Sequence, residues 1–229
     1  MIRTPAAGGA SVAPPGSLVC VVEDDASFRA ALASLLGSVG HKVAAFDSAA
    51  AFFKDAPQDS VGCLVIDIRL PGISGLQFQE ELSRIGSTIP IVFMTGHGDV
   101  GMSVKAMKGG AVDFLEKPFR DQDMLDAVAA AMERDRQRRD SDRAALAVRS
   151  AFETLTPREK EVMAFVTAGL MNKQIAAEIG LSEITVKIHR GHLMRKMAAR
   201  SVAELVRMAD QLDVRSPPRN RDPRRAIET

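Results

Sequence analysis

The chain has 229 residues, of which 46% are hydrophobic and 26% charged, a balance that argues against a disordered or collagen-like protein and suits one large or two small globular domains. Aromatic residues comprise ten Phe and no Trp or Tyr, which disfavours binding of RNA or single strands by aromatic stacking. Residues 1–130 carry 10 basic and 15 acidic side chains, against 20 and 14 in 131–229; the division indicates either a metal or phosphate site joined to a nucleic-acid binder, or merely a solvated surface.

The first 16 residues, MIRTPAAGGASVAPPG, are expected to form a disordered arm, since they lack the apolar segment of a signal peptide. No later run approaches the roughly 18 apolar residues of a membrane span, so no membrane partner is expected. Cys20 and Cys63 fit no metal-ligand spacing. We therefore expect both to be reduced core residues of a cytoplasmic protein.

Short apolar runs then alternate with helical patterns. Strands are expected at 18–22, 42–46, 63–68, 90–95 and 112–117. Helices are expected at 27–39, 48–54, 76–85 and 100–107, with Gly40, Gly86 and Gly109 near their C-terminal ends. This alternation predicts an α/β domain whose parallel sheet has helices on both faces and reactive groups at the carboxyl ends of its strands.

Residues 119–156 contain neither Gly nor Pro. An apolar stripe that includes Met124 and Val128 would cover the sheet, and ERDRQRRDSDR at 133–143 then loses all apolar character. The second stretch is either a solvated, frayed helix end that serves as a linker, or part of a continuous helix that belongs to a dimer seam. Because apolar heptads do not persist, we favour a partly helical linker over 131–151 without a committed coiled coil.

The remaining pattern is purely helical. Thr156, Pro157 and Glu159 form the start of a helix with a capping box. The segment NKQIAAEIG, a turn, and SEITVKIHRGHLMRKM with Ser182 as its cap predict a helix-turn-helix whose second helix enters the DNA major groove. SVAELVRMADQL closes this domain, and the Pro/Arg-rich residues 213–229 are expected to be disordered.

Polar groups end several of the predicted strands: Glu23, Asp24, Asp25, Asp67, Thr95 and Lys117. Asp25 is expected to be only the solvated start of the next helix. The other carboxylates would repel one another without a cation, and Mg2+ suits their oxygen ligands. Asp67 could then be the nucleophile of phosphoryl transfer, assisted by Thr95 and Lys117. Singly, Thr95 is typical of a turn and Lys117 of a surface, so their joint placement carries this interpretation.

VVEDDASFR, VIDIRLPGISG, PIVFMTGHGD and FLEKPF resemble the four signature stretches of bacterial response-regulator receiver domains, over 17–130. The resemblance implies a flavodoxin-like five-stranded sheet of order 2-1-3-4-5. It also implies that Asp67 is phosphorylated, and that Mg2+ is held by Glu23, Asp24, Asp67 and the backbone carbonyl of Arg69. Thr95 and Lys117 would contact the phosphoryl group, and the Lys117–Pro118 bond would be cis. Phe114 takes the switch position and lacks a hydroxyl, so it would switch by packing.

On the second helix of the helix-turn-helix, an inward stripe is expected from Ile184, Ile188 or Val186, Leu193 and Met197. The cations Lys187, Arg190, Arg195 and Lys196 would then meet phosphates or base edges. A charged, solvated helix face is the alternative.

Residues 152–212 resemble the four-helix DNA-binding domain of the FixJ/NarL (LuxR-type) regulators, and the whole chain resembles the FixJ/StyR-like subgroup. The resemblance implies phosphate contacts and groove contacts by these residues: Lys173 and Thr185 at phosphates; Lys187, Ile188 and Gly191 in the groove; Arg190 and Arg195 nearby. Met171 departs from the usual small polar residue, which leaves Asn172 as the expected cap. Gly191 stands where a larger side chain is common, so base readout rests on fewer contacts.

These features predict a two-component transcriptional regulator. A sensor histidine kinase would phosphorylate Asp67, and the resulting homodimer would bind double-stranded promoter DNA and work with RNA polymerase, more commonly as an activator in this family. Two alternatives come from other classes. Phosphohydrolases with an aspartate nucleophile carry a DxD motif, in which the second acid is the proton donor. Here Arg69 stands in that second position, so slow self-dephosphorylation is expected in place of enzymatic turnover. A receiver used only for protein docking is disfavoured by the basic helical domain.

Overall fold

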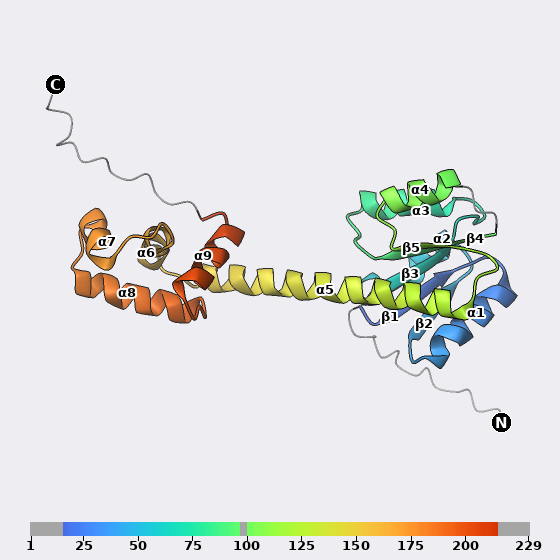
Figure 1. Ribbon diagram of the computed structural model, residues 1–229, viewed down its shortest axis with the longest axis horizontal. Coiled ribbons are helices and arrows are strands. Elements are labelled where there is room, and N and C mark those ends of the chain that lie inside the picture. The colour runs from blue at the N-terminus through green and yellow to red at the C-terminus, as the bar shows by residue number, and fades with distance from the viewer. Residues whose placement is uncertain (1–15, 97–99, 215–229) are drawn as a thin grey trace, which may run out of the picture. The chain divides into compact units, whose positions relative to one another are not determined.

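The computed structural model describes residues 16–96 and 100–214, which divide into two compact units, residues 1–140 and 141–229. The expected arm at 1–16 and tail at 213–229 lie almost wholly outside the described residues. Within the described part of the chain, no helix is both long and apolar enough to cross a lipid bilayer. Figure 1 labels the elements of both units.

The first unit is built on a five-stranded parallel sheet in the order β2-β1-β3-β4-β5, which confirms the predicted order. Every residue of β1, β3 and β4 is buried, as expected for strands covered on both faces. The predicted bounds of the first two strands are correct, and those of the others differ by one or two residues. The strands are β1 (Leu18–Val22), β2 (Lys42–Phe46), β3 (Val61–Asp67), β4 (Ile91–Thr95) and β5 (Asp113–Glu116).

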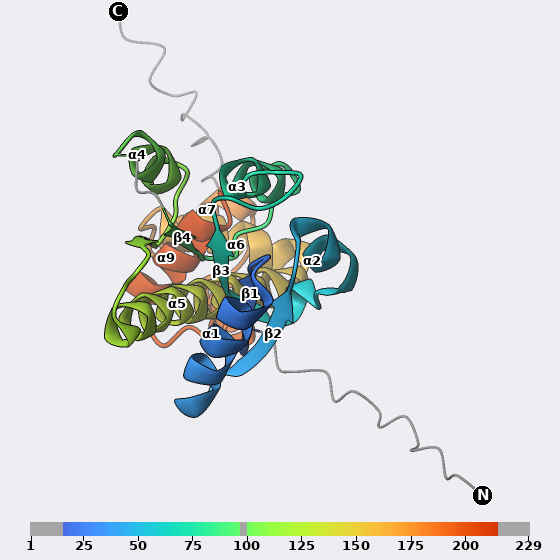
Figure 2. The ribbon, with the colours of Figure 1, turned by 90° about the vertical axis from the view of Figure 1, so that its right-hand side faces the viewer.

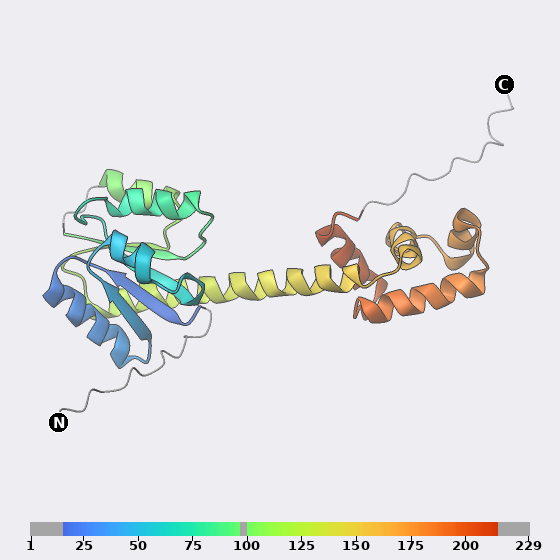
Figure 3. The same ribbon diagram turned by 180° about the vertical axis from the view of Figure 1, so that it is seen from behind.

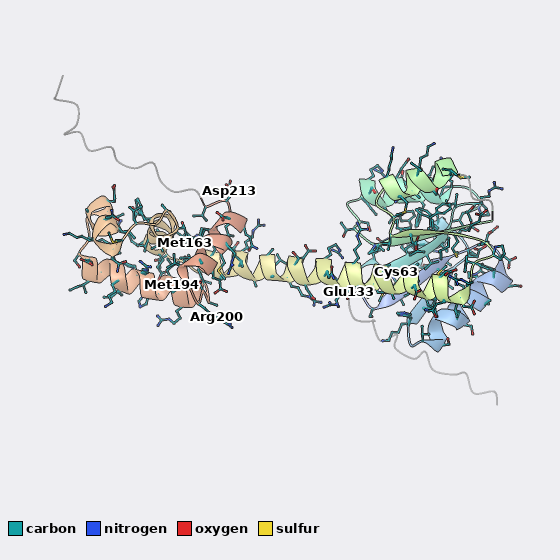
Figure 4. The ribbon with its side chains drawn as sticks, viewed as in Figure 1. Cys63, Glu133, Met163, Met194, Arg200 and Asp213 are labelled. Atoms are coloured by element: carbon teal, nitrogen blue, oxygen red, sulfur yellow. The ribbon has the colours of Figure 1, made fainter. Side chains whose placement is uncertain are left out.

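Helices cover both faces of this sheet (Figure 2). They are α1 (Ala26–Ser38), α2 (Ala49–Asp55), a short 3-10 turn (Gln58–Ser60), α3 (Gly75–Arg84), α4 (Val100–Lys108) and α5 (Asp121–Glu153). One core lies between the sheet and α1 and α5, with Leu36 and Val128 fully buried. The other includes Phe52 of α2 and Phe78 of α3, whose rings meet edge to face. Both cysteines are buried free thiols, as predicted, and Cys63, labelled in Figure 4, is a residue of β3.

Short polar residues fix where the helices begin and end. The Asp25 carboxylate accepts the Phe28 N–H at 2.8 Å and caps α1, which confirms its predicted place at a helix start. Gly40 and Gly86 follow their helices with φ of 91° and 75°. After α4, Gly109 is the first residue beyond the helix, as predicted, and the left-handed conformation falls on the next residue, Gly110, with φ of 91°. A side chain at Gly109 would collide with Gln79, because its Cβ would lie 2.6 Å from the Gln79 Oε1.

Helix α5 runs without interruption from Asp121 to Glu153, so the favoured partly helical linker is wrong (Figures 1 and 3). Its charged run contains a buried acid, Asp135, which is 1% exposed. The Asp135 carboxylate accepts hydrogen bonds from Arg138 Nη2 at 2.7 Å and Arg139 Nε at 2.5 Å. Arg139 Nη2 in turn donates to the Val61 carbonyl at 3.0 Å, at the amino end of β3. A stretch without apolar residues therefore still packs on the sheet.

The second unit contains α6 (Pro157–Thr167), α7 (Asn172–Ile179), α8 (Glu183–Lys196) and α9 (Val202–Gln211), and Phe152 of α5 packs on its core. Figure 4 labels Met163, which is fully buried there. The capping box of Thr156 and Glu159 is present, with Pro157 as the first helical residue, as predicted. Ser182 caps α8, also as predicted.

The predicted cap of α7 is wrong. Asn172 is the first residue inside the helix, and Met171 occupies the cap position with its backbone N–H bonded to Gln174 Oε1 at 2.8 Å. The Asn172 side chain instead contacts α8, where its Oδ1 accepts a hydrogen bond from Arg190 Nη1 at 3.0 Å. The start of α7 is thereby tied to the middle of α8.

Candidate functional site

Four polar side chains predicted to meet at one edge of the sheet lie at the ends of four strands. Glu23 follows β1 and is 2% exposed, Asp67 ends β3 at 6%, and Thr95 ends β4 at 0%. Lys117 follows β5, and its backbone N–H donates to the Thr95 carbonyl at 2.7 Å. The parallel order of the strands is what brings these carboxyl ends together.

Lys117 joins the two buried carboxylates. Its Nζ lies 2.6 Å from Glu23 Oε2 and 2.6 Å from Asp67 Oδ2. The other Asp67 oxygen accepts the backbone N–H of Arg69 at 2.8 Å. The Lys117–Pro118 peptide bond is cis, as expected. Each oxygen of the Asp67 carboxylate thus accepts a charge-assisted hydrogen bond, one from the Lys117 ammonium and one from a backbone N–H.

Burial and ion pairing compete at this site. Burial raises the pKa of Glu23, and its hydrogen bond and attraction to Lys117 only partly offset that effect. Burial by itself would lower the pKa of Lys117, but hydrogen bonds to Asp67 and Glu23 outweigh it and raise the pKa above its ordinary value. Lys117 therefore carries a fixed positive charge at neutral pH, next to the carboxylate best placed to react.

Two further predicted ligands lie at the rim. Asp24 is exposed beside the buried pair, and so is Arg69, whose backbone carbonyl is the predicted ligand. In the part of the chain that the structure describes, no group of three or more His, Cys, Asp or Glu side chains is arranged as a metal site. The donors nevertheless suit a hard cation, because Glu23 and Asp67 are oxygen ligands that already share one cationic partner, and Mg2+ commonly takes one or two carboxylates from a protein.

The predicted switch residue, Phe114, is half-buried on β5 and pairs in register with Phe93 of β4. Its ring packs against the core that contains Phe78. His97 of the loop after β4 lies outside the described residues.

Sequence reasoning missed two residues of this edge, Phe28 and Arg29. Lys117 Nζ lies 4.2 Å from the centre of the Phe28 ring, a cation–π contact that also shields the ammonium from water. Arg29 Nη1 donates to the backbone carbonyls of Glu23, at 2.5 Å, and Asp24, at 3.1 Å. Both residues lie in the first turn of the helix that follows Asp25, and that position was the signal available in the sequence.

A second candidate surface is the outward face of α8. The expected inward stripe is correct for Val186, Leu193 and Met197, which are 0%, 0% and 2% exposed. It is wrong for Ile184 and Ile188, which are 74% and 52% exposed. Of the two residues expected as alternatives on the inward stripe, Val186 faces inward and Ile188 does not.

The cations of α8 divide into two groups. Lys187 and Arg195 are exposed, as are Lys173 of α7 and Gly191. Arg190 is half-buried and donates to Asn172, and Lys196 is paired with Glu159, so these two cations also have partners within the unit. Thr185 is engaged at the cap, where its N–H donates to Ser182 Oγ at 3.1 Å. Two of the helix's cations thus hold it in place, and two remain for a ligand.

Glu159 fixes the end of α8 to the start of α6. This carboxylate is 3% exposed, accepts Lys196 Nζ at 2.6 Å and the Thr156 N–H at 2.8 Å, and lies 3.8 Å from His192 Nδ1. Burial would raise the pKa of Glu159, but the hydrogen bonds from Lys196 and Thr156 outweigh it and hold the pKa below its ordinary value of 4.5. Folding therefore gains free energy from the ionised form.

We expect the second unit to lose stability in acid because of Glu159. A depressed pKa contributes stability that is present above 4.5 and is lost as the pH falls through the lower, folded-state value. Glu159→Gln keeps the capping box but removes the charge, and should cost about 1–2 kcal/mol at neutral pH, with less loss at low pH. Urea unfolding followed by circular dichroism at several pH values measures both effects. Glu161→Gln, at the more exposed pair with Arg158, is the control and should change little.

Comparison with known families gives two matches that together span most of the chain. Residues 19–129 match the model described as response regulator receiver domain. Residues 153–209 match the model described as bacterial regulatory proteins, luxR family.

Relatives and solved structures match over both units. Nodulation protein W of Bradyrhizobium diazoefficiens is 58% identical over 207 residues, which cover 90% of this chain and 91% of that protein. Transcriptional regulatory protein FixJ of Azorhizobium caulinodans is 44% identical over 85% of this chain and 93% of its own. The structure of response regulator StyR aligns with a TM-score of 0.77 and 45% identity, over 85% of this chain and 98% of that one. Full-length FixJ from B. japonicum aligns with a TM-score of 0.54 and 41% identity, over 86% and 97%.

Proposed function

Because this chain belongs to the two-component response regulators that carry a LuxR-type DNA-binding domain, we propose that phosphorylation of Asp67 by a sensor histidine kinase controls its binding to promoter DNA. One observation carries the proposal: Lys117 Nζ lies 2.6 Å from both Asp67 and Glu23 at the carboxyl edge of the sheet. A carboxylate held between a lysine and a backbone N–H is positioned for phosphoryl transfer. The receiver would span 17–130, the linker 131–151 and the DNA-binding domain 152–212.

The residues of the edge divide the work of the transfer. An Asp67 oxygen bonds to phosphorus while the bond from phosphorus to the donor's imidazole nitrogen breaks. Lys117 turns from Asp67 to the transferred oxygens and stabilises their charge, and the Thr95 hydroxyl donates to another of them. Phe28 keeps the lysine ammonium near the edge during this change of partner.

Glu23, Asp24, Asp67 and the Arg69 backbone carbonyl would hold Mg2+. The ion offsets the negative charge of the phosphoryl group and of the acidic residues when it is bound. Arg69 also supports slow self-dephosphorylation in place of enzymatic turnover, because its side chain cannot serve as a general acid two residues after the nucleophile.

Phosphorylation would be read out through β5 and α4. The added charge draws Thr95 towards Asp67, and Phe114 then packs further inward. Val100, Val104 and Met107 of α4 are 78%, 45% and 47% exposed, which gives the surface from α4 to β5 an apolar area for a homodimer. Two copies of α8 would then meet the two halves of a symmetric promoter site in double-stranded DNA.

The dimer would act on transcription, as an activator, by placing RNA polymerase at the promoter, in the cytoplasm. Lys187, Ile188 and Gly191 would face the major groove, with Lys173, Thr185, Arg190 and Arg195 at or near the phosphates. The exposure of Lys187, Arg195 and Lys173 supports this division.

Duplex binding by the full chain tests the proposal. With acetyl phosphate and Mg2+ present, sedimentation should show dimerisation, and fluorescence anisotropy should show tighter, steeply salt-dependent binding to duplexes selected by the protein. Lys187→Ala should weaken this binding by about 1–3 kcal/mol. Arg207→Ala removes an equal charge from the exposed side of α9 and should have a smaller effect. Salt-insensitive binding, or equal losses in both variants, would count against α8 as the DNA-binding helix.

A further inference from the structure

The outward face of α8 carries an apolar strip, with the exposed Lys187 beside it and the exposed Arg195 at its C-terminal end. Positions 184, 188, 191 and 195 are spaced by four, three and four residues, so they fall on one side of a helix with 3.6 residues per turn. The buried Val186 and Leu193 lie on the opposite side and fix this orientation. Ile184, Ile188 and Gly191 therefore present a strip that faces solvent.

The strip is not explained by stability. Ile184 is 74% exposed, so packing contributes little there, and β-branched residues are weaker helix formers than Ala or Leu. Beyond Gly191 the space is open, because a Cβ built there meets no atom within 4 Å. The apolar side chain thus gains little within its own unit, and the glycine lets another molecule approach the helix closely.

Charge indicates what that molecule is. Lys187 and Arg195 flank the strip and are exposed, whereas Arg190 and Lys196 are bonded to Asn172 and Glu159. Two cations beside an apolar strip match a DNA major groove that exposes thymine, since the C5-methyl of thymine is the apolar group among the base edges.

We infer that Ile184 determines sequence specificity by packing against a thymine methyl group, one helical turn before Ile188. The inference rests on the proposed function, in which α8 enters the major groove. It assigns to Ile184 a base contact of its own and predicts a thymine in each half-site.

Deletion of the methyl group from the DNA tests this contact. The probe is a duplex selected by the full-length chain with acetyl phosphate, then synthesised with each thymine replaced in turn by deoxyuridine, which keeps base pairing and lacks the methyl. Replacement at one position in each half-site should weaken binding about fourfold per methyl, the equivalent of one lost buried methyl group. In Ile184→Ala, binding should be weaker and that replacement should have no further effect.

Controls separate this result from its alternatives. Ile184→Ala should fold, because the side chain is exposed and Ala favours helix. Ile188→Ala should leave the effect at the Ile184-sensitive thymine in place. The inference is overturned if no thymine is methyl-sensitive, if sensitivity persists in Ile184→Ala, or if that variant changes only the oligomeric state in sedimentation, which would make the strip a protein contact. A chain that binds no duplex overturns the proposed function as well.

Discussion

Replacing Asp67 with asparagine is expected to abolish the response of dimerisation and DNA binding to a phosphoryl donor. The asparagine amide has nearly the same shape but no carboxylate oxygen that can attack phosphorus. The fold should survive, because the amide oxygen can still accept a hydrogen bond from Lys117 Nζ or the Arg69 N–H, and the loss of charge should cost only about 1–2 kcal/mol. Intact-mass measurement after incubation with acetyl phosphate reports the covalent step, and sedimentation reports its consequence.

Asp55→Asn is the matched control, since Asp55 is an exposed carboxylate at the end of α2. This variant should gain mass and dimerise as the unaltered chain does. A mass increase in Asp67→Asn, or a change in sedimentation on adding the donor, would show that another residue is the acceptor. Unaltered mass in the parent chain would instead remove phosphorylation from the mechanism.

The strands could be located from the sequence because each is a short apolar run that ends in polar or Gly/Pro residues. A strand buried on both faces gives such a run, and residues 18–22 have the predicted bounds. Helix ends were harder. Gly109 and Gly110 are equivalent as signals of a helix end, and the sequence does not tell which of them takes the left-handed conformation that Gly110 has in the structure.

Which residues lie at the carboxyl edge of the sheet could be predicted from the topology, but the contacts between their side chains could not. Parallel strands in alternation with helices bring the ends of β1, β3, β4 and β5 together whatever their side chains are. That Lys117 bridges Glu23 and Asp67, and that Phe28 lies 4.2 Å from its ammonium, depends on side-chain rotamers that no spacing rule contains. The same limit applies to α8, because hydrophobicity alone does not distinguish the exposed Ile184 from the buried Val186.

The linker shows a different limit, because a segment without apolar residues can still be buried. A run of Asp and Arg reads as solvated, yet a carboxylate can be buried when two guanidinium groups satisfy its oxygens. Asp135 meets that condition through Arg138 and Arg139 on its own helix, at spacings of three and four residues. These spacings were visible in the sequence, and the contact of Arg139 with the Val61 carbonyl was not.

This buried pair leads to the second large effect that we expect. Asp135→Ala should lower the free energy of unfolding of the first unit by about 2–3 kcal/mol, because Arg139, whose side chain is 19% exposed, loses its counter-charge against the sheet. The value lies below that for a fully buried pair, since Arg138 is 32% exposed and can be solvated. Urea unfolding of the full chain by circular dichroism gives the loss, and hydrogen exchange should show faster exchange at the start of β3 and in residues 133–143.

Asp140→Ala provides the comparison on the same helix. Asp140 pairs with Arg136 at the surface, with both side chains more than half exposed, so its removal should change stability by less than about 1 kcal/mol. Both variants introduce alanine into α5, so the gain in helix propensity is similar in the two. The difference between their losses of stability therefore reports the burial of Asp135. Equal effects of the two substitutions would mean that the Asp135 cluster adds nothing beyond a surface ion pair. Unequal stability with unchanged exchange at β3 would mean that the cluster stiffens α5 without joining it to the sheet.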